Sequence, residues 1–126
     1  MDEAVRRALE RGGICDITTT GRRSGLPRRI EIYFHNLDGT FYLSGRPGFP
    51  RDWMANLIHH PRFALHLKRG VVADLEAEAT PIRDDETRRS VLYRIRTESW
   101  GASPDEVIAG LDRWVESAPL VTFRLV

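Results

Sequence analysis

The sequence predicts one α+β domain in which antiparallel strands, joined by short turns, close into a small barrel with flanking helices. Apolar and polar residues alternate through the middle of the chain, and turn residues separate the alternating segments by only a few positions. Helical patterns lie at the start, between strands and near the end. With 126 residues and 41% hydrophobic content, the chain suits a single domain over residues 1–126.

Two helices and three strands are predicted in the first half of the chain. Each helical segment has one apolar face and ends at a breaker, Gly12–Gly13 for the first and Pro61 for the second. The strands are rich in β-branched residues or alternate with period two, with Tyr33 and His35 on the polar face of the second. The predicted ranges are helices before residue 12 and at 51–60, and strands at 14–20, 28–35 and 40–44.

Three strands and two helices are predicted in the second half. Arg69–Gly70 is a tight turn between two alternating segments, which predicts a hairpin. Ser103 followed by Glu106 three residues later is the pattern of a capping box at a helix start. The predicted ranges are strands at 63–68, 71–81 and 120–126, and helices at 84–98 and 104–117.

Composition narrows the functional classes. The chain has no run of 18 apolar residues and no charged n-region followed by an apolar h-region, so we expect neither membrane insertion nor export. The single cysteine, Cys15, lies in an apolar stretch, which favours a buried thiol in a cytoplasmic setting. His35 and His66 lie on polar strand faces, where a surface position is expected, and His59–His60 do not form a metal pair, so no metal site is predicted.

The densest charged motif is TTTGRRSGLPR, at residues 18–28. Its glycines allow backbone N–H groups to turn toward a ligand, and Ser24 adds a hydroxyl group. Arg22, Arg23 and Arg28 offer planar guanidinium groups that match phosphate or carboxylate oxygens. The residues alone fit an anion-binding loop and a solvated hairpin loop about equally well.

A second motif, SGRPGFPRDWMANL at residues 44–57, places Arg46 between turn residues at the end of a strand. There it is expected to join the first arginine cluster around one anion. Trp53 and Asn56 are three residues apart, hence on one helical face, where an aromatic wall and an amide line the same pocket. The alternative is a core position for Trp53 and a surface position for Asn56.

The two motifs together resemble those of the deazaflavin-dependent nitroreductase family. The resemblance covers roughly residues 14–80 and rests on ITTTGRRSGLPR followed, after a strand pair, by SGRPG and DWMANLIHHP. It implies an antiparallel split β-barrel related to the FMN-binding oxidoreductases, with flanking helices. It also implies an enzyme that transfers a hydride from reduced deazaflavin coenzyme F(420) to a small organic acceptor: a quinone, a nitro compound or an enone.

The resemblance also assigns residues by position. The residues that would hold the phosphate and acidic tail of the cofactor are Arg22, Arg23, Ser24 and Arg28. Those that would flank the same cofactor are Arg46, Trp53 and Asn56. Ser44, at a strand end beside the expected ring pocket, is the candidate proton donor, with Tyr33 and His35 as alternatives.

Several alternatives remain beside this interpretation. The same fold and a similar cradle would suit FMN, although residues 22–28 offer more positive charge than one phosphate requires. A non-catalytic carrier of flavin, haem or fatty acid is compatible with the lack of tyrosines after Tyr93, because family members active on nitroaromatics close their substrate pocket with C-terminal tyrosines. Too few aromatic residues are interleaved with the arginines for a nucleic-acid surface. A homodimer is expected from the resemblance.

Overall fold

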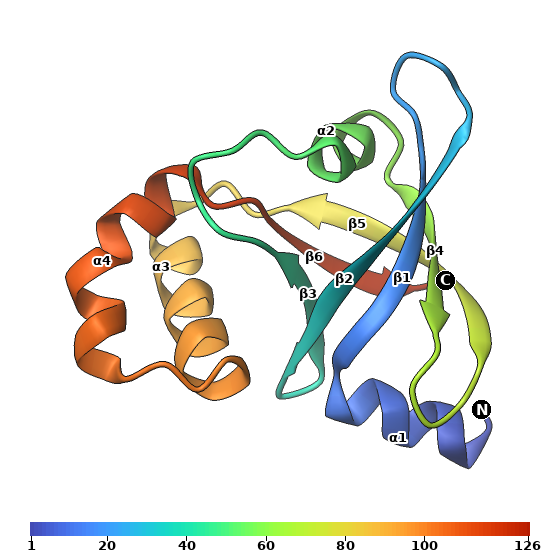
Figure 1. The fold of residues 1–126 in the computed structure, drawn as a ribbon, viewed down its shortest axis with the longest axis horizontal. Coiled ribbons are helices and arrows are strands. Elements are labelled where there is room, and N and C mark those ends of the chain that lie inside the picture. Colours follow the sequence, from blue (N-terminus) through green and yellow to red (C-terminus); the bar gives the residue numbers. More distant parts are fainter.

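The computed structural model describes residues 1–126 as a closed antiparallel β-barrel with helices packed around it (Figure 1). The strands are β1 Gly13–Thr20, β2 Pro27–Leu37, β3 Thr40–Ser44, β4 Arg62–Leu67, β5 Ala73–Pro81 and β6 Leu120–Leu125. The helices are α1 Glu3–Arg11, α2 Asp52–His59, α3 Asp85–Arg94 and α4 Pro104–Ser117, with a π-helical turn, η1 Ile95–Ser99, directly after α3. The predicted α+β class and the barrel are confirmed.

The barrel closes in the order β1-β2-β3-β6-β5-β4, and every neighbouring pair is antiparallel. Three of these pairs are hairpins of consecutive strands, as the turn residues predict. Closure depends on pairs that lie far apart in the sequence, such as Ile17 opposite Leu65 in β1–β4 and Leu43 opposite Val121 in β3–β6. Apolar side chains on the inner face of each strand therefore meet in one interior.

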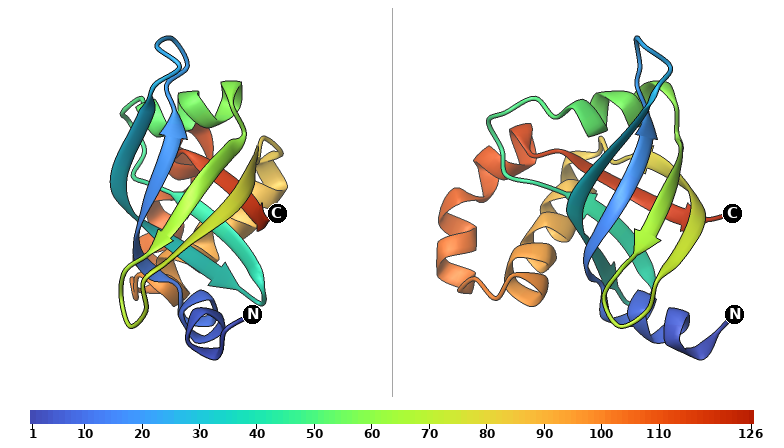
Figure 2. Two further views of the ribbon diagram at one scale, coloured as in Figure 1. Left: turned by 90° about the vertical axis from the view of Figure 1, so that its right-hand side faces the viewer. Right: turned by 45° about the vertical axis from the view of Figure 1, so that its right-hand side comes forward.

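Two hydrophobic clusters hold the helices to the barrel. The first fills the barrel and includes Trp53 and Leu57 from α2, which covers one end, while α1 covers the other end (Figure 2). The second joins α3, η1 and α4 to Leu37 and Leu120 on the barrel wall. None of the helices combines the length and the apolar character that crossing a lipid bilayer requires.

The predicted helix at 84–98 is wrong in its last turn, because α3 ends at Arg94 and the chain continues as η1. The Trp100 N–H donates to the Ile95 carbonyl, five residues back. The Thr97 hydroxyl donates to the Tyr93 carbonyl, four residues back, at 2.9 Å. The Ser103 N-cap is confirmed, since its hydroxyl oxygen accepts the Glu106 N–H.

The expected surface positions of the strand histidines are wrong. His35 is 1% exposed because η1 covers this part of β2, and its Nδ1 lies 2.6 Å from Ser99 Oγ. His66 is 9% exposed and lies between the side chains of Thr18 and Asp74 on neighbouring strands. The buried thiol is confirmed, and burial raises the pKa of Cys15 to about 12.

Acid should destabilise the fold through His35. Burial lowers the pKa of His35 to about 4, whereas histidine in an unfolded chain titrates near 6.5. Between these values the unfolded state binds a proton that the folded state excludes, so stability falls as the pH drops below about 6.5. We expect a loss of about 2 kcal/mol at pH 5 relative to pH 7.5.

The measurement is urea unfolding at both pH values for the wild type and for His35→Gln. The variant, whose side chain does not titrate, should lose about 2 kcal/mol less between the two conditions. Equal pH dependence in the two proteins would contradict a role for His35.

Candidate functional site

The loop between β1 and β2 has a conformation that depends on its glycines. The Gly21 N–H donates to the Leu26 carbonyl at 2.8 Å, and the Gly25 N–H donates to the Gly21 carbonyl at 2.9 Å. Gly25 has a φ of 70°, and a Cβ at Gly21 would lie 2.5 Å from Ser24 Oγ. The loop projects beyond the barrel on the side of α2 (Figure 2). These two bonds close the loop on itself, and the side chains of Arg23 and Arg28 are exposed.

A groove of about 620 Å³ lies between this loop and α2. We call it the arginine groove, because four of its lining residues are arginines and only one, Asp52, is acidic. The residues of the predicted site that line it are Arg22, Arg23, Ser24, Arg28, Trp53 and Asn56. The structure therefore brings six of the eight predicted site residues to one positively charged surface.

Asn56 joins the loop to the helix. Its side chain is buried, so the alternative of a surface position for Asn56 does not hold. Its Oδ1 accepts the backbone N–H of Arg22 at 3.0 Å, and its Nδ2 donates to Thr19 Oγ1 at 3.1 Å. Because α2 is itself anchored in the barrel through Trp53, this amide fixes the position of the loop relative to the core.

The arginines of the groove differ in what they bind within the chain. Arg22 Nη1 lies 3.4 Å from both Asp52 Oδ1 and Asn56 Oδ1, and Arg29 pairs with Asp16 outside the groove at 3.1 Å. The side chains of Arg23 and Arg28 are exposed and make no hydrogen bond or ion pair. Ser24 Oγ accepts the Leu26 N–H, which leaves its own hydrogen free to donate. These groups are available for an anionic ligand.

Two predicted site residues lie elsewhere. Ser44 is 5% exposed, and its hydroxyl donates to the Pro119 carbonyl at 2.8 Å. Arg46 faces a different cleft, beside Trp100 and Trp114, so it does not join the other arginines around one anion. The role of Ser44 as proton donor stays a prediction that this geometry does not support.

Sequence reasoning missed Thr19 and Asp52, which also belong to the groove. Thr19 lies on the same inward-facing side of β1 as Cys15 and Ile17. The alternation of the strand therefore indicates a core position for Thr19 and gives no sign of a binding role. Asp52 begins α2, where an acidic residue is also explained by the helix dipole. Only the packing of α2 against the loop assigns both residues to the groove.

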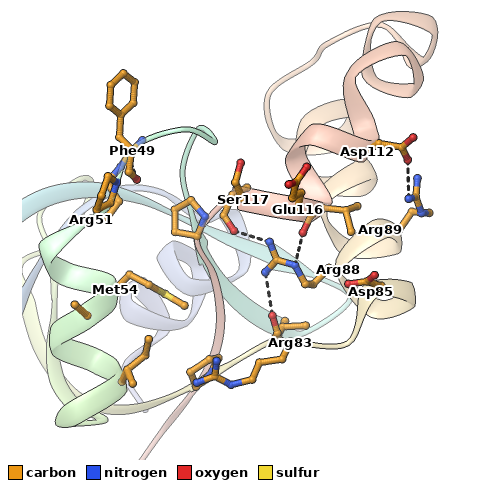
Figure 3. Close-up of a pocket in the computed structure, with 18 residues that line it drawn as sticks. Phe49, Arg51, Met54, Arg83, Asp85, Arg88, Arg89, Asp112, Glu116 and Ser117 are labelled. Atoms are coloured by element: carbon orange, nitrogen blue, oxygen red, sulfur yellow. Dashed lines mark hydrogen bonds and ion pairs between the residues drawn. The ribbon is translucent and has the colours of Figure 1, made fainter.

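The largest cavity, of about 740 Å³, lies between α2 and the α3–α4 pair (Figure 3). Two of its arginines have partners within the chain. Arg88 donates to the carbonyls of Ile82, Val115 and Ala118 at 2.9, 2.8 and 2.6 Å, and Arg89 pairs with Asp112 at 2.7 Å. These bonds join α3 to the end of α4, so they indicate a structural role and not an anion site.

Comparison with protein families decides what kind of protein carries this groove. Residues 2–112 match the model of the F(420)H(2)-dependent quinone reductase family. The chain belongs to this family. An F(420)H(2)-dependent quinone reductase is an oxidoreductase enzyme, so the chain is an oxidoreductase that depends on the reduced deazaflavin coenzyme. The resemblance to deazaflavin-dependent reductases is thereby confirmed, and it extends beyond residue 80 into α3 and part of α4.

Solved structures similar to this F(420)H(2)-dependent quinone reductase family member share its fold. A conserved hypothetical protein from Mycobacterium tuberculosis aligns with a TM-score of 0.73 and 18% identity, over 99% of this chain and 84% of that one. The haem storage protein HutZ from Vibrio cholerae aligns with a TM-score of 0.64 and 16% identity, over 96% of this chain and 85% of HutZ. A FAD-binding protein from Mesorhizobium loti aligns with a TM-score of 0.63 and 11% identity, over 100% of this chain and 91% of that protein. No curated protein sequence matches the chain.

Proposed function

We propose that the arginine groove binds the phosphate and acidic tail of F(420)H(2), and that the enzyme reduces a quinone. The observation that carries the proposal is the pair of unpartnered guanidinium groups, Arg23 and Arg28, beside a third, Arg22, whose backbone Asn56 holds in place. The groove is lined by four arginines and one carboxylate, Asp52, which pairs with Arg22, and this excess of positive charge suits a ligand with several negative charges. The family match supports a quinone as the acceptor class.

Besides positive charge, the groove offers the coenzyme a hydroxyl donor and an apolar surface. Ser24 contributes a hydroxyl donor, and Trp53 and Ile30 contribute the apolar part of the lining. When bound, the reduced deazaflavin supplies a hydride, and the quinone also takes up a proton to become a quinol. The contribution of the protein is to bind the charged tail tightly and far from the reacting atoms, which orients the coenzyme.

The test is oxidation of F(420)H(2) by the purified full chain with menadione as acceptor, followed by the return of the absorbance of oxidised F(420). We expect turnover with menadione that is faster than with a nitroaromatic compound or a cyclic enone. Reduced FMN in place of the deazaflavin should give no protein-dependent rate. If F(420)H(2) binds but no acceptor of the three classes is reduced, the proposal of a quinone reductase fails and the carrier interpretation gains support.

The homodimer and the cytoplasmic setting expected from the sequence stay predictions. One structural neighbour, with a TM-score of 0.58, is described as a domain-swapped dimer. Its likeness to this chain is one of fold.

A further inference from the structure

Two loops at the α2 end of the barrel share a short sequence pattern. Residues 25–28 read GLPR and residues 48–51 read GFPR, so each loop has glycine, a large apolar residue, proline and arginine in the same order. The first segment leads into β2, and the second comes directly before α2. The β1–β2 loop projects beyond the barrel on the side of α2, and the β3–α2 loop runs up to that helix (Figure 2). We call residues 25–28 and 48–51 the two loop tips.

The apolar residue of each loop tip is exposed. Leu26 is 59% exposed and Phe49 is 71% exposed. Gly25 has a φ of 70° and Gly48 a φ of 99°, so in both tips a backbone conformation that favours glycine turns the chain just before the apolar residue. The ring of Phe49 points away from the cavity that its backbone borders (Figure 3). Folding thus leaves both apolar side chains in contact with water, where they gain nothing from burial.

The backbone around these apolar residues is largely hydrogen-bonded within the chain. The Leu26 N–H donates to Ser24 Oγ at 3.1 Å, and the Leu26 carbonyl accepts the Gly21 N–H at 2.8 Å. The Phe49 carbonyl accepts a bond from Arg51 Nη1 at 3.1 Å, and the Arg51 guanidinium carbon lies 5.8 Å from the Phe49 ring centre. The proline that follows each apolar residue has no N–H. Both tips therefore bring few unpaired backbone groups into an apolar layer, where such groups are costly.

Positive charge surrounds the two tips. Residues 21–28 and 45–52 carry five arginines and one acidic residue, Asp52. The side chains of Arg23 and Arg28, on either side of Leu26, are exposed and have no partner within the chain. Leu26 and Phe49 do not line the arginine groove, so binding of an anion in that groove would leave both of them in water. Apolar tips among arginines match a surface that has anionic groups outside and an apolar layer beneath.

We propose that the two loop tips dock the protein on an anionic lipid bilayer. Leu26 and Phe49 enter the boundary between headgroups and acyl chains, and the arginines lie among the anionic headgroups. Two single side chains on separate loops give reversible binding, and together they orient the α2 end of the barrel toward the lipid. Docking goes beyond the reduction of a quinone, because it requires neither the coenzyme nor an acceptor.

The test is co-sedimentation of the full chain, without coenzyme, with sucrose-loaded vesicles of two parts phosphatidylcholine to one part phosphatidylglycerol. We expect binding that added salt weakens, and no measurable binding to vesicles of phosphatidylcholine alone. Leu26→Ser and Phe49→Ser should each weaken binding by about tenfold, because each removes an apolar side chain from the lipid. Arg23→Gln should weaken it by about fivefold through the lost attraction to the headgroups.

The matched controls lie at the opposite end of the barrel. Val72 is 84% exposed and lies with the exposed Arg69 in the loop between β4 and β5 (Figure 2). Val72→Ser and Arg69→Gln remove the same kinds of group and should bind the anionic vesicles as the wild type does. All five substituted side chains are exposed, so the variants should fold normally, and circular dichroism checks this.

The proposal fails if the wild type does not bind the anionic vesicles, if it binds neutral vesicles equally well, or if Val72→Ser loses as much binding as Phe49→Ser. It also fails if Leu26→Ser and Phe49→Ser change the oligomeric state on size-exclusion chromatography and leave vesicle binding unchanged, because the tips would then contact a second copy of the chain. Since the vesicle assay contains no coenzyme and no acceptor, its outcome is independent of F(420) binding and of quinone reduction.

Discussion

Replacing Arg22 and Arg28 together by glutamine should reduce the affinity for F(420) by about a hundredfold or more. Each removed guanidinium costs roughly 1.5–3 kcal/mol as a charged hydrogen bond, and the two losses act on the same anionic tail. The loop itself should keep its shape, because Asn56 Oδ1 accepts the backbone N–H of Arg22 at 3.0 Å, and this bond remains when the side chain is replaced. Equilibrium titration of the coenzyme by fluorescence gives the two dissociation constants.

The matched control is Arg7→Gln with Arg62→Gln, which removes the same net charge from α1 and β4, away from the groove. We expect this pair to change the affinity by less than about threefold at physiological ionic strength, because separated surface charges are screened over about 8 Å. Affinity losses of equal size in the two double variants would show that only the overall charge of the protein attracts the coenzyme. In that case the arginine groove would not be its binding site.

Replacing Arg88 by alanine should destabilise the protein by about 3 kcal/mol. Arg88 is 8% exposed, and its guanidinium donates to the carbonyls of Val115 and Ala118 at the end of α4 and of Ile82 before α3 (Figure 3). A longer bond, of 3.4 Å, reaches the Trp114 carbonyl. The last carbonyls of a helix have no partner within the helix, so the arginine satisfies acceptors that would otherwise be buried unpaired. The adjoining cavity admits water to the vacated site, and this limits the loss.

The adjacent residue provides the control for this prediction. Arg89 is exposed and pairs only with the exposed Asp112, so Arg89→Ala should cost less than about 1 kcal/mol. The free energies of unfolding come from urea titrations of both variants and the wild type at pH 7.5. Similar losses in the two variants would mean that the carbonyl bonds of Arg88 contribute no more than a surface ion pair.

Local pattern was sufficient to predict the strands and helices, since alternation and helical spacing are properties of short segments. The predicted ranges agree with the structure to within a few residues, and the main difference is the π-helical turn Ile95–Ser99. In that turn the Trp100 N–H bonds five residues back to the Ile95 carbonyl, and hydrophobic spacing does not reveal such a change in the backbone hydrogen-bond pattern. His35 was misplaced for a related reason, because η1 and Trp100 cover a strand face that alternation marks as polar.

Some residues of the candidate site are neighbours in the sequence, and others are brought together only by packing. Arg22, Arg23, Ser24 and Arg28 are neighbours in one loop, so the sequence brings them together, and the glycines set their conformation. Trp53 and Asn56 reach the same groove only because α2 packs on the end of the barrel. The direction of the chain after Ser44 is set by how the β3–α2 loop meets the α3–α4 pair, and it carries Arg46 to another cleft.

The sequence by itself determined the elements, their hairpins and the positive charge of TTTGRRSGLPR, because each depends on residues close together in the chain. Only the tertiary structure decided how the barrel closes, which arginines keep free guanidinium groups and which histidines are shielded from water. These outcomes depend on contacts between distant segments, β1 with β4, β3 with β6 and β2 with η1, and local periodicity does not encode such contacts.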